Sequence, residues 1–134
     1  MITVVIAITR HQAGNWLLER LNLLGKPHTS DPDRWSVEVA DDWLAVAKAD
    51  YVQEDYEPDE LESLARRVSD PAFYVLEAHT ESIAARYIKT LPEDLDLLID
   101  NDHGWIAPVS DYKEAMAEGL DWLHAKPRNG RVAT

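Results

Sequence analysis

The sequence predicts a single α/β domain, an α+β sandwich in which a mixed sheet of about five to six strands is covered by about four helices. Three observations support this class. The chain has 134 residues, a length typical of one domain. Hydrophobic residues make up 46% of it, enough for a core that buries roughly two-thirds of the unfolded surface. Segments with strand periodicity alternate with segments of helical periodicity, as in layered folds.

The N-terminal segment begins with a strand. Residues 2–9 carry apolar side chains at both odd and even positions, as expected of a central strand that is covered on both sides. Residues 14–24 carry four leucines at helical spacing, and the Gly-Lys-Pro sequence that follows predicts the end of this helix. Residues 28–34 are polar, contain a proline and predict a loop.

A hairpin and a second helix are expected next. Residues 35–40 alternate apolar and polar side chains, which indicates a half-buried strand. Residues 43–49 favour a second strand joined through Asp41 and Asp42, although a short alanine-rich helix capped by Asp41 fits the same residues. The helix expected over residues 58–68 begins with proline, places acids in its first turn and arginines in its last, and so matches the helix dipole.

The C-terminal half shows a clearer alternation. Residues 73–78 predict an apolar strand, and Thr80 is the expected N-cap of a helix that runs to Leu91 and ends before Pro92. Residues 94–100 alternate aspartates with leucine and isoleucine, which favours another strand.

A return strand over residues 105–107 and a last helix complete the order. We expect Ser110 to cap this helix and Leu123 to lie on its buried face. The first six elements follow the order of a ferredoxin-like split βαβ unit. Residues 1–125 are therefore predicted to form one domain, and residues 126–134 a flexible polar tail.

The stretch from Asp100 to Gly104, Asp-Asn-Asp-His-Gly, separates two apolar segments. Asp100 and Asp102 lie two positions apart, so both carboxylates point the same way in an extended chain. Together with His103, and with His79 nearby, they offer ligands for a divalent cation. The calcium-loop pattern is not met, because Gly104 stands where the third ligand belongs. The composition favours a hairpin turn first, a partner contact second and a metal or catalytic site third.

Two acidic patches are candidates for partner binding. Residues 50–62 contain seven acids and no base, and a basic partner would relieve their self-repulsion. The candidate residues in this run are Glu54, Asp55, Glu57, Asp59 and Glu60. The second patch comprises Asp100, Asp102, His103 and Trp105. Core packing is the expected role of most tryptophans here, but Trp105 beside an acidic turn would suit an interface hot spot if it were exposed.

Several chemistries lack support in the sequence. There are no cysteines, so disulfides, thiolate zinc sites and cysteine nucleophiles are excluded. Glycine-rich phosphate loops, paired-histidine metal motifs and the G-x-S-x-G nucleophile motif are absent. We therefore expect no catalytic residue, metal or cofactor. The N-terminus lacks signal-peptide features and no apolar stretch approaches the ~20 residues of a membrane helix, so we expect a cytoplasmic protein without membrane contact.

Charge is the strongest global property. The chain carries 13 Lys and Arg against 25 Asp and Glu, a formal net charge of −12. The basic residues Lys126, Arg128 and Arg131 follow the last acid, Asp121, so the body of the protein is more acidic than the whole. Such a surface repels nucleic acid and accelerates the encounter with a basic protein. Acidity that serves only solubility is the alternative.

The C-terminal half resembles a family of known proteins. The sequence FYVLEAHTESIAARYIKTLPEDLDLLIDNDHGWIAPVSDYKEAMAEGLDWL, over about residues 72–124, resembles small bacterial proteins, some of them tied to immunity against polymorphic or contact-dependent toxins. The resemblance lies in a strand, a helix ending in Leu-Pro, the segment DLLIDNDHG and a closing Asp-Trp. Such immunity proteins are small, acidic and cytosolic, and they block a toxin by binding it. The resemblance implies a non-enzymatic inhibitor and supplies no catalytic residues.

Three functional hypotheses follow. The leading one is an immunity-type binding protein that neutralises a basic partner, such as a nuclease toxin, through its acidic patches. The second is a small metal-binding protein or metal-dependent enzyme that uses Asp100, Asp102 and His103. The third is a structural or homodimeric protein, which would leave an apolar surface uncovered in the monomer.

Overall fold

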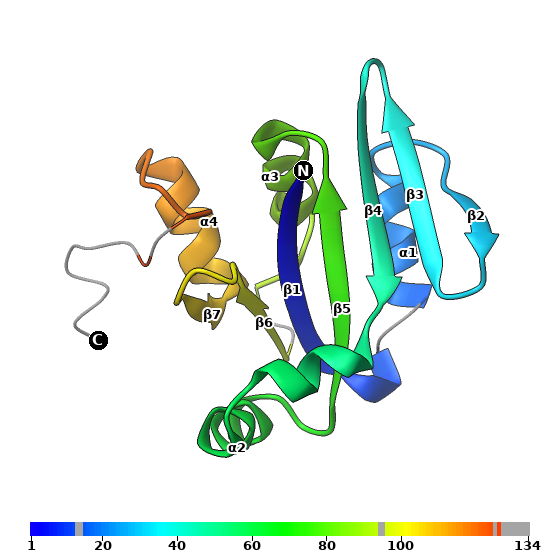
Figure 1. Cartoon of the computed structure of the whole chain (residues 1–134). Helices are drawn as coiled ribbons and strands as arrows, with labels where there is room; N and C mark the ends of the chain where they lie inside the picture. Colours follow the sequence, from blue (N-terminus) through cyan, green and yellow to red (C-terminus); the bar gives the residue numbers. More distant parts are fainter. Residues whose placement is uncertain (13–14, 94–95, 125, 127–134) are drawn as a thin grey trace.

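The computed structural model describes residues 1–12, 15–93, 96–124 and 126. Seven strands among these residues form one sheet in the order β2-β3-β4-β5-β1-β6-β7 (Figure 1). The strands are β1 (Ile2–Thr9), β2 (His28–Asp31), β3 (Arg34–Val39), β4 (Asp42–Lys48), β5 (Pro71–Ala78), β6 (Leu97–Asp100) and β7 (Ile106–Pro108). The helices are α1 (Asn15–Asn22), α2 (Pro58–Arg67), α3 (Glu81–Lys89) and α4 (Val109–Ala117), with 3-10 helices η1 (Arg10–Gln12) and η2 (Asp50–Asp55).

The expected combination of sheet and helices is confirmed, but the sheet differs from the prediction in two respects. It has seven strands instead of five to six, and every pair of neighbouring strands is antiparallel, so the predicted mixed sheet is wrong. Within the described residues, no helix has both the length and the apolar character needed to cross a membrane.

The strand β1 lies inside the sheet and pairs with β5 on one side and β6 on the other. Its side chains alternate between the two faces of the sheet. Val4, Ile6 and Ile8 belong to one buried cluster, whereas Val5 and Ala7 belong to another on the opposite face. We call these the inner face and the outer face. The predicted central strand is thus confirmed, and its side chains from Val4 to Ile8 are buried on both faces.

The helices divide between the two faces. The inner face packs against α1, α3 and α4, whose buried Leu21, Tyr87 and Tyr112 share its core cluster. The outer face is covered by η2 and α2, which contribute Val52 and Leu64. In Figure 1, η2 and α2 cross the lower end of the front of the sheet and leave the upper part of β1, β5 and β4 uncovered. The outer face is therefore only partly buried.

Local sequence signals explain where two of these helices begin. In α3 the Thr80 hydroxyl accepts a hydrogen bond from the Ile83 backbone N–H at 3.4 Å, so the predicted N-cap is confirmed. In α2 the Glu57 backbone N–H donates to the Glu60 side chain at 2.9 Å, half of a capping box just before Pro58. The predicted start of this helix at Pro58 is also confirmed.

The N-terminal predictions failed at one segment. Residues 28–34 do not form a loop: β2 is an edge strand that pairs irregularly with β3. Its sequence, His-Thr-Ser-Asp, has no apolar alternation because little of it is buried, so no periodic signal marks it. The hairpin of β3 and β4 is confirmed against the helical alternative. Ala40 takes the positive φ of 55° in its turn, beside the expected aspartates.

The last helix also differs from its prediction. The N-cap position of α4 is Pro108, so Ser110 lies inside the helix instead of capping it. The helix ends at Ala117, and Gly119 adopts a φ of +72° shortly afterwards. Leu123 is buried, as expected, but beyond the helix. Residues 94–95 and all but Lys126 of the predicted tail, 126–134, lie outside the described residues.

The ferredoxin-like arrangement predicted for the first half is unconfirmed. A split βαβ unit occurs later in the chain instead. The strands β5 and β6 are joined through α3, and β1 lies between them and is antiparallel to both. The first strand of the chain is thus inserted between two later ones.

The buried Tyr87 is expected to make the free energy of unfolding depend on pH in the alkaline range. Its buried hydroxyl donates to the Leu17 carbonyl at 3.0 Å, and burial raises its pKa above the ordinary value of 10.0. The neutral phenol contributes fully below pH 10, and the free energy of unfolding falls as pH rises above 10, because the unfolded chain loses its proton first. We expect Tyr87→Phe to reduce this slope by up to about 1.4 kcal/mol per pH unit, and to cost about 1 kcal/mol at pH 7.

Urea unfolding between pH 7 and pH 11 measures this effect. Tyr51→Phe, which removes a hydroxyl from an exposed ring, controls for the substitution itself. Equal alkaline slopes for the wild type and Tyr87→Phe would show that Tyr87 does not cause the dependence.

Candidate functional site

The register of the sheet places a row of side chains across the outer face. Val5 of β1 pairs with Val75 of β5 on one side and with Asp100 of β6 on the other. Asp100 in turn pairs with Ile106 of β7. Directly paired residues share a face of the sheet. Four strands therefore contribute adjacent side chains, three apolar and one acidic, to one surface.

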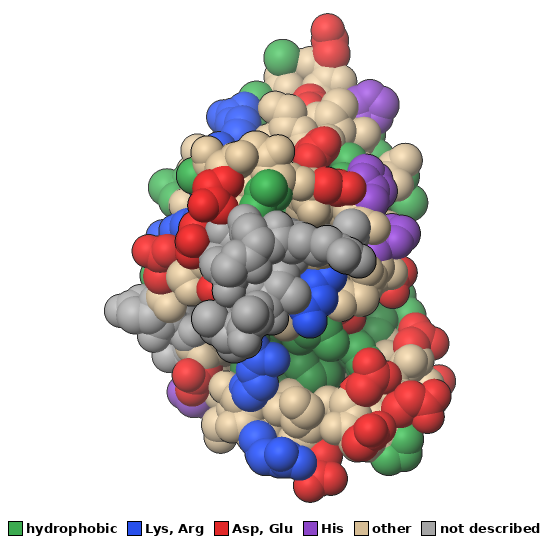
Figure 2. Space-filling view, turned by 90° about the vertical axis from the view of Figure 1, so that its left-hand side faces the viewer, with side chains coloured by type: hydrophobic (Ala, Val, Ile, Leu, Met, Phe, Trp, Pro, Cys, Tyr) green, Lys and Arg blue, Asp and Glu red, His purple; other side chains and the backbone are tan. Residues whose placement is uncertain are grey.

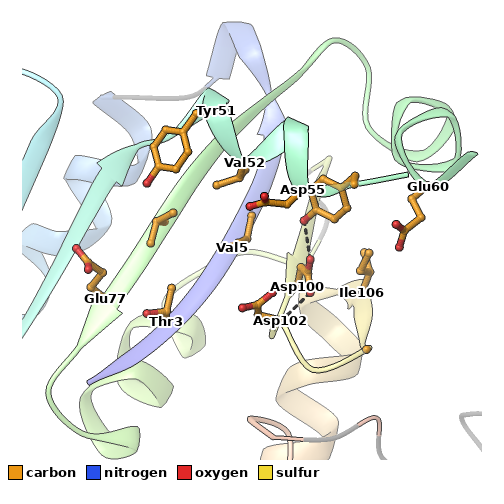
Figure 3. Close-up of a pocket in the computed structure, with 13 residues that line it drawn as sticks. Thr3, Val5, Tyr51, Val52, Asp55, Glu60, Glu77, Asp100, Asp102 and Ile106 are labelled. Carbon is orange, nitrogen blue, oxygen red and sulfur yellow. Dashed lines mark hydrogen bonds between the residues drawn. The ribbon is translucent and has the colours of Figure 1, made fainter. Parts of the chain in front are cut away.

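This row is the floor of a hollow of about 430 Å³. Its walls come from η2, the start of α2 and the turn between β6 and β7, as Figure 3 shows. The lining residues are Thr3, Val5, Tyr51, Val52, Asp55, Tyr56, Glu60, Val75, Glu77, Asp100, Asp102, Gly104 and Ile106. The size is in the range of ligand-binding pockets.

The hollow is strongly acidic. Five carboxylates line it: Asp55, Glu60, Glu77, Asp100 and Asp102. Among the described residues no lysine, arginine or histidine lines it. Glu77 is paired with Arg34 at 3.7 Å, so its charge is partly compensated. Figure 2, which views the molecule from the side of α4, shows carboxylates over much of this side, several of them around hydrophobic side chains at the lower right.

Asp100 joins two walls of the hollow. One carboxylate oxygen accepts a hydrogen bond from the Tyr56 hydroxyl at 2.5 Å, and the other accepts from the Asp102 backbone N–H at 2.8 Å. Burial raises the pKa of Tyr56, and the hydrogen bond to Asp100 and the charges of Asp100, Asp102 and Glu60 raise it further. Several carboxylates therefore act on one phenol in this hollow, as expected of a region of negative potential.

The turn between β6 and β7 is built around a buried amide. Asn101 is 0% exposed. Its side-chain oxygen accepts from the backbone N–H groups of His103 at 2.8 Å and Trp105 at 3.3 Å, and its side-chain nitrogen donates to the Trp122 carbonyl at 2.9 Å. Asp102 has a φ of +64°, a conformation that aspartate tolerates better than most residues. This geometry is the turn that the composition favours.

Trp105 does not lie on the surface. It is 7% exposed, and its ring stacks on Tyr112 with centroids 4.1 Å apart, while the Tyr112 hydroxyl donates to the Trp105 carbonyl at 2.8 Å. Trp105 therefore lacks the exposure that an interface hot spot would need, and it has the core role expected of most tryptophans. The indole packs in the core between the turn and α4, where burial of this large apolar ring stabilises the fold.

The other predicted contact residues divide into two groups. Asp55 and Glu60 of the acidic run line the hollow together with Asp100 and Asp102, so the structure brings the two acidic patches together. The other candidate residues of the run, Glu54, Glu57 and Asp59, are exposed but lie outside the lining.

The histidines considered for a metal site lie elsewhere. The ring of the exposed His103 makes an edge contact with His124, at 5.7 Å between centroids. His79 is exposed and stacks on Trp43. Neither His103 nor His79 lines the hollow. Within the part of the chain that the structure describes, no three His, Asp or Glu side chains are placed to hold a metal ion together.

Sequence reasoning missed two tyrosines and a glutamate of the site. Tyr51 and Tyr56 lie inside the acidic run, and Tyr51 is 68% exposed. Glu77 is the single acid in the apolar strand β5, and it has the same parity as Val75 and the same outward orientation. Two sequence signals could have identified these residues: a single acid in an apolar strand, and tyrosines within an acidic run.

Comparison with known proteins provides no relative. No family model, no curated protein and no solved structure matches the chain.

Asn101 is expected to be essential for the turn. We expect Asn101→Ala to lower the free energy of unfolding by about 2–4 kcal/mol, because two backbone N–H groups lose their acceptor in a buried position. Urea denaturation measures the change. Asp102→Asn is the matched control, because this side chain is exposed and asparagine also tolerates positive φ, so we expect a change below about 0.5 kcal/mol. Similar stabilities of Asn101→Ala and the wild type would contradict the role given to Asn101.

The hydrogen bond between Tyr56 and Asp100 is expected to hold α2 against the sheet. We expect Tyr56→Phe to lower the free energy of unfolding by about 1–3 kcal/mol, since a hydrogen bond to a charged acceptor is lost while the ring contact with Phe73 is kept. Hydrogen exchange of the α2 amides should accelerate more than exchange in α3. Uniform acceleration in both helices would argue against a local effect.

Proposed function

We propose that this protein is a non-enzymatic binding protein of the immunity type, which neutralises a basic partner such as a bacterial nuclease toxin. The observation that carries the proposal is the acidic hollow on the outer face, where the two acidic patches adjoin. Its carboxylates lie beside an uncovered part of the sheet, so a partner has room to approach.

Charge supports this function in two ways. The net charge of −12 attracts a basic protein from a distance and raises the association rate. At contact, Asp55, Glu60 and Asp102 offer carboxylates that have no ion pair within the described residues. A nuclease binds phosphates with a cationic cleft, and carboxylates held over that cleft would compete with the nucleic acid.

The apolar floor adds the second component of a protein interface. Val5, Val75 and Ile106 form part of the lining at the edge of the uncovered sheet. Apolar area surrounded by charged groups is the usual composition of an interface with a buried centre and a polar rim.

A binding assay with the proteins encoded by the neighbouring genes tests the proposal. Each basic product is purified and titrated against this protein by calorimetry, at low and at high salt. We expect one of them to bind, with an affinity that falls as salt rises. We expect the double variant Asp55→Asn with Asp102→Asn to weaken binding about tenfold or more, equivalent to about 1.4 kcal/mol.

The control is the double variant Glu54→Gln with Asp59→Asn. It removes two negative charges, as the first variant does, but from exposed positions outside the hollow. It therefore distinguishes the loss of contacts in the hollow from the effect of a lower net charge. Inhibition of the partner's nuclease activity by the wild type and not by Asp55→Asn with Asp102→Asn would complete the case. Absence of binding by every basic neighbour, or binding that is indifferent to salt, would refute the proposal.

A further inference from the structure

We propose that the hollow accepts one arginine side chain presented by the partner. This inference rests on the proposed function and names the group that the site recognises. It starts from the whole hollow and not from the carboxylates alone. The uncovered sheet supplies an apolar floor, η2 supplies an exposed aromatic ring, and the carboxylates stand on several sides of both (Figure 3).

The spacing of the carboxylates argues for a wide cation. They come from η2, α2, β5, β6 and the turn after β6, and among the described residues no three of them are placed to share a metal ion. Asp100 already accepts hydrogen bonds from Tyr56 and from the Asp102 backbone. Guanidinium carries five N–H donors in a rigid plane and can reach separated carboxylates at the same time. A metal ion or an ammonium group is more compact and acts as a point charge.

The apolar part of the hollow suits the rest of the arginine side chain. The methylene stem of arginine can lie along Val5, Val75 and Ile106 while its charged end reaches the rim. Tyr51 is 68% exposed and offers a ring face at the opposite side of the hollow from Glu60 (Figure 3). Guanidinium stacks on such rings more readily than ammonium does. Stacking on the guanidinium would be the role of the exposed Tyr51.

Short peptides test the inference on the full-length protein without the partner. The probes are acetyl-Gly-Arg-Gly-amide, its lysine analogue and its citrulline analogue, which keeps the shape of arginine without the charge. Amide chemical shifts are followed by NMR at low salt. We expect saturable shifts in η2, β1 and the β6–β7 turn for the arginine peptide, several-fold weaker binding of the lysine peptide, and none of the citrulline peptide.

Variants assign the binding to named side chains. We expect the Asp55→Asn, Asp102→Asn double variant to weaken arginine binding about tenfold, and Tyr51→Ala to weaken it about threefold to fivefold. Tyr51→Phe should keep the affinity, because the ring remains. The control Glu54→Gln with Asp59→Asn should bind as the wild type does. Because Asp55, Asp102 and Tyr51 are exposed, these variants should fold, and their NMR spectra verify it.

The outcomes separate this inference from the proposed function. If a basic partner binds in a salt-dependent manner but the arginine peptide shifts no residue of the hollow, the arginine site is wrong and the proposed function stands. If the arginine peptide binds at the hollow but no basic neighbour binds, the proposed function fails and the arginine site is upheld. Equal binding of the lysine or citrulline peptide would overturn the preference for guanidinium.

Discussion

The register of β1 between β5 and β6 is the constraint on which both the core and the hollow depend. Side chains alternate along a strand, so a shift of one residue would move Ile6 and its inner-face neighbours outward and bring Val5 into the helix-covered core. The same ladder sets Val5 opposite both Val75 and Asp100. A pairing that is needed for packing thus also determines which side chains meet at the surface.

In the turn after β6, buried residues that stabilise the turn alternate with exposed residues within a few positions. Asn101 and Trp105 are buried and hold the turn through hydrogen bonds and aromatic packing. Asp102 and Gly104 between them remain exposed and adopt positive φ values. A buried amide whose hydrogen-bonding groups are satisfied gives such a turn a defined shape. The exposed carboxylate of Asp102 is thus positioned by residues that are themselves buried.

Local signals in the sequence were sufficient for elements whose ends or faces are set locally. The two apolar faces of β1 and the cap at Thr80 were predicted because burial and capping leave periodic or positional patterns. The edge strand β2 was missed because little of it is buried. The end of α4 was missed because it depends on the positive φ of Gly119, which apolar periodicity does not show. The hollow was beyond local reasoning, because it requires Val5 to meet Asp100, and only long-range pairing decides that.

The double role of Asp100 has a consequence for how the molecule would respond to a ligand. The carboxylate that helps to hold α2 through Tyr56 is also part of the surface offered to a cation. A cation that bound Asp100 would change the strength of the Tyr56 hydrogen bond. By thermodynamic reciprocity, the docking of α2 would then change the affinity of the hollow for that cation by the same factor by which the cation changes the docking equilibrium. Binding at the outer face and the docking of α2 on that face would therefore be thermodynamically coupled.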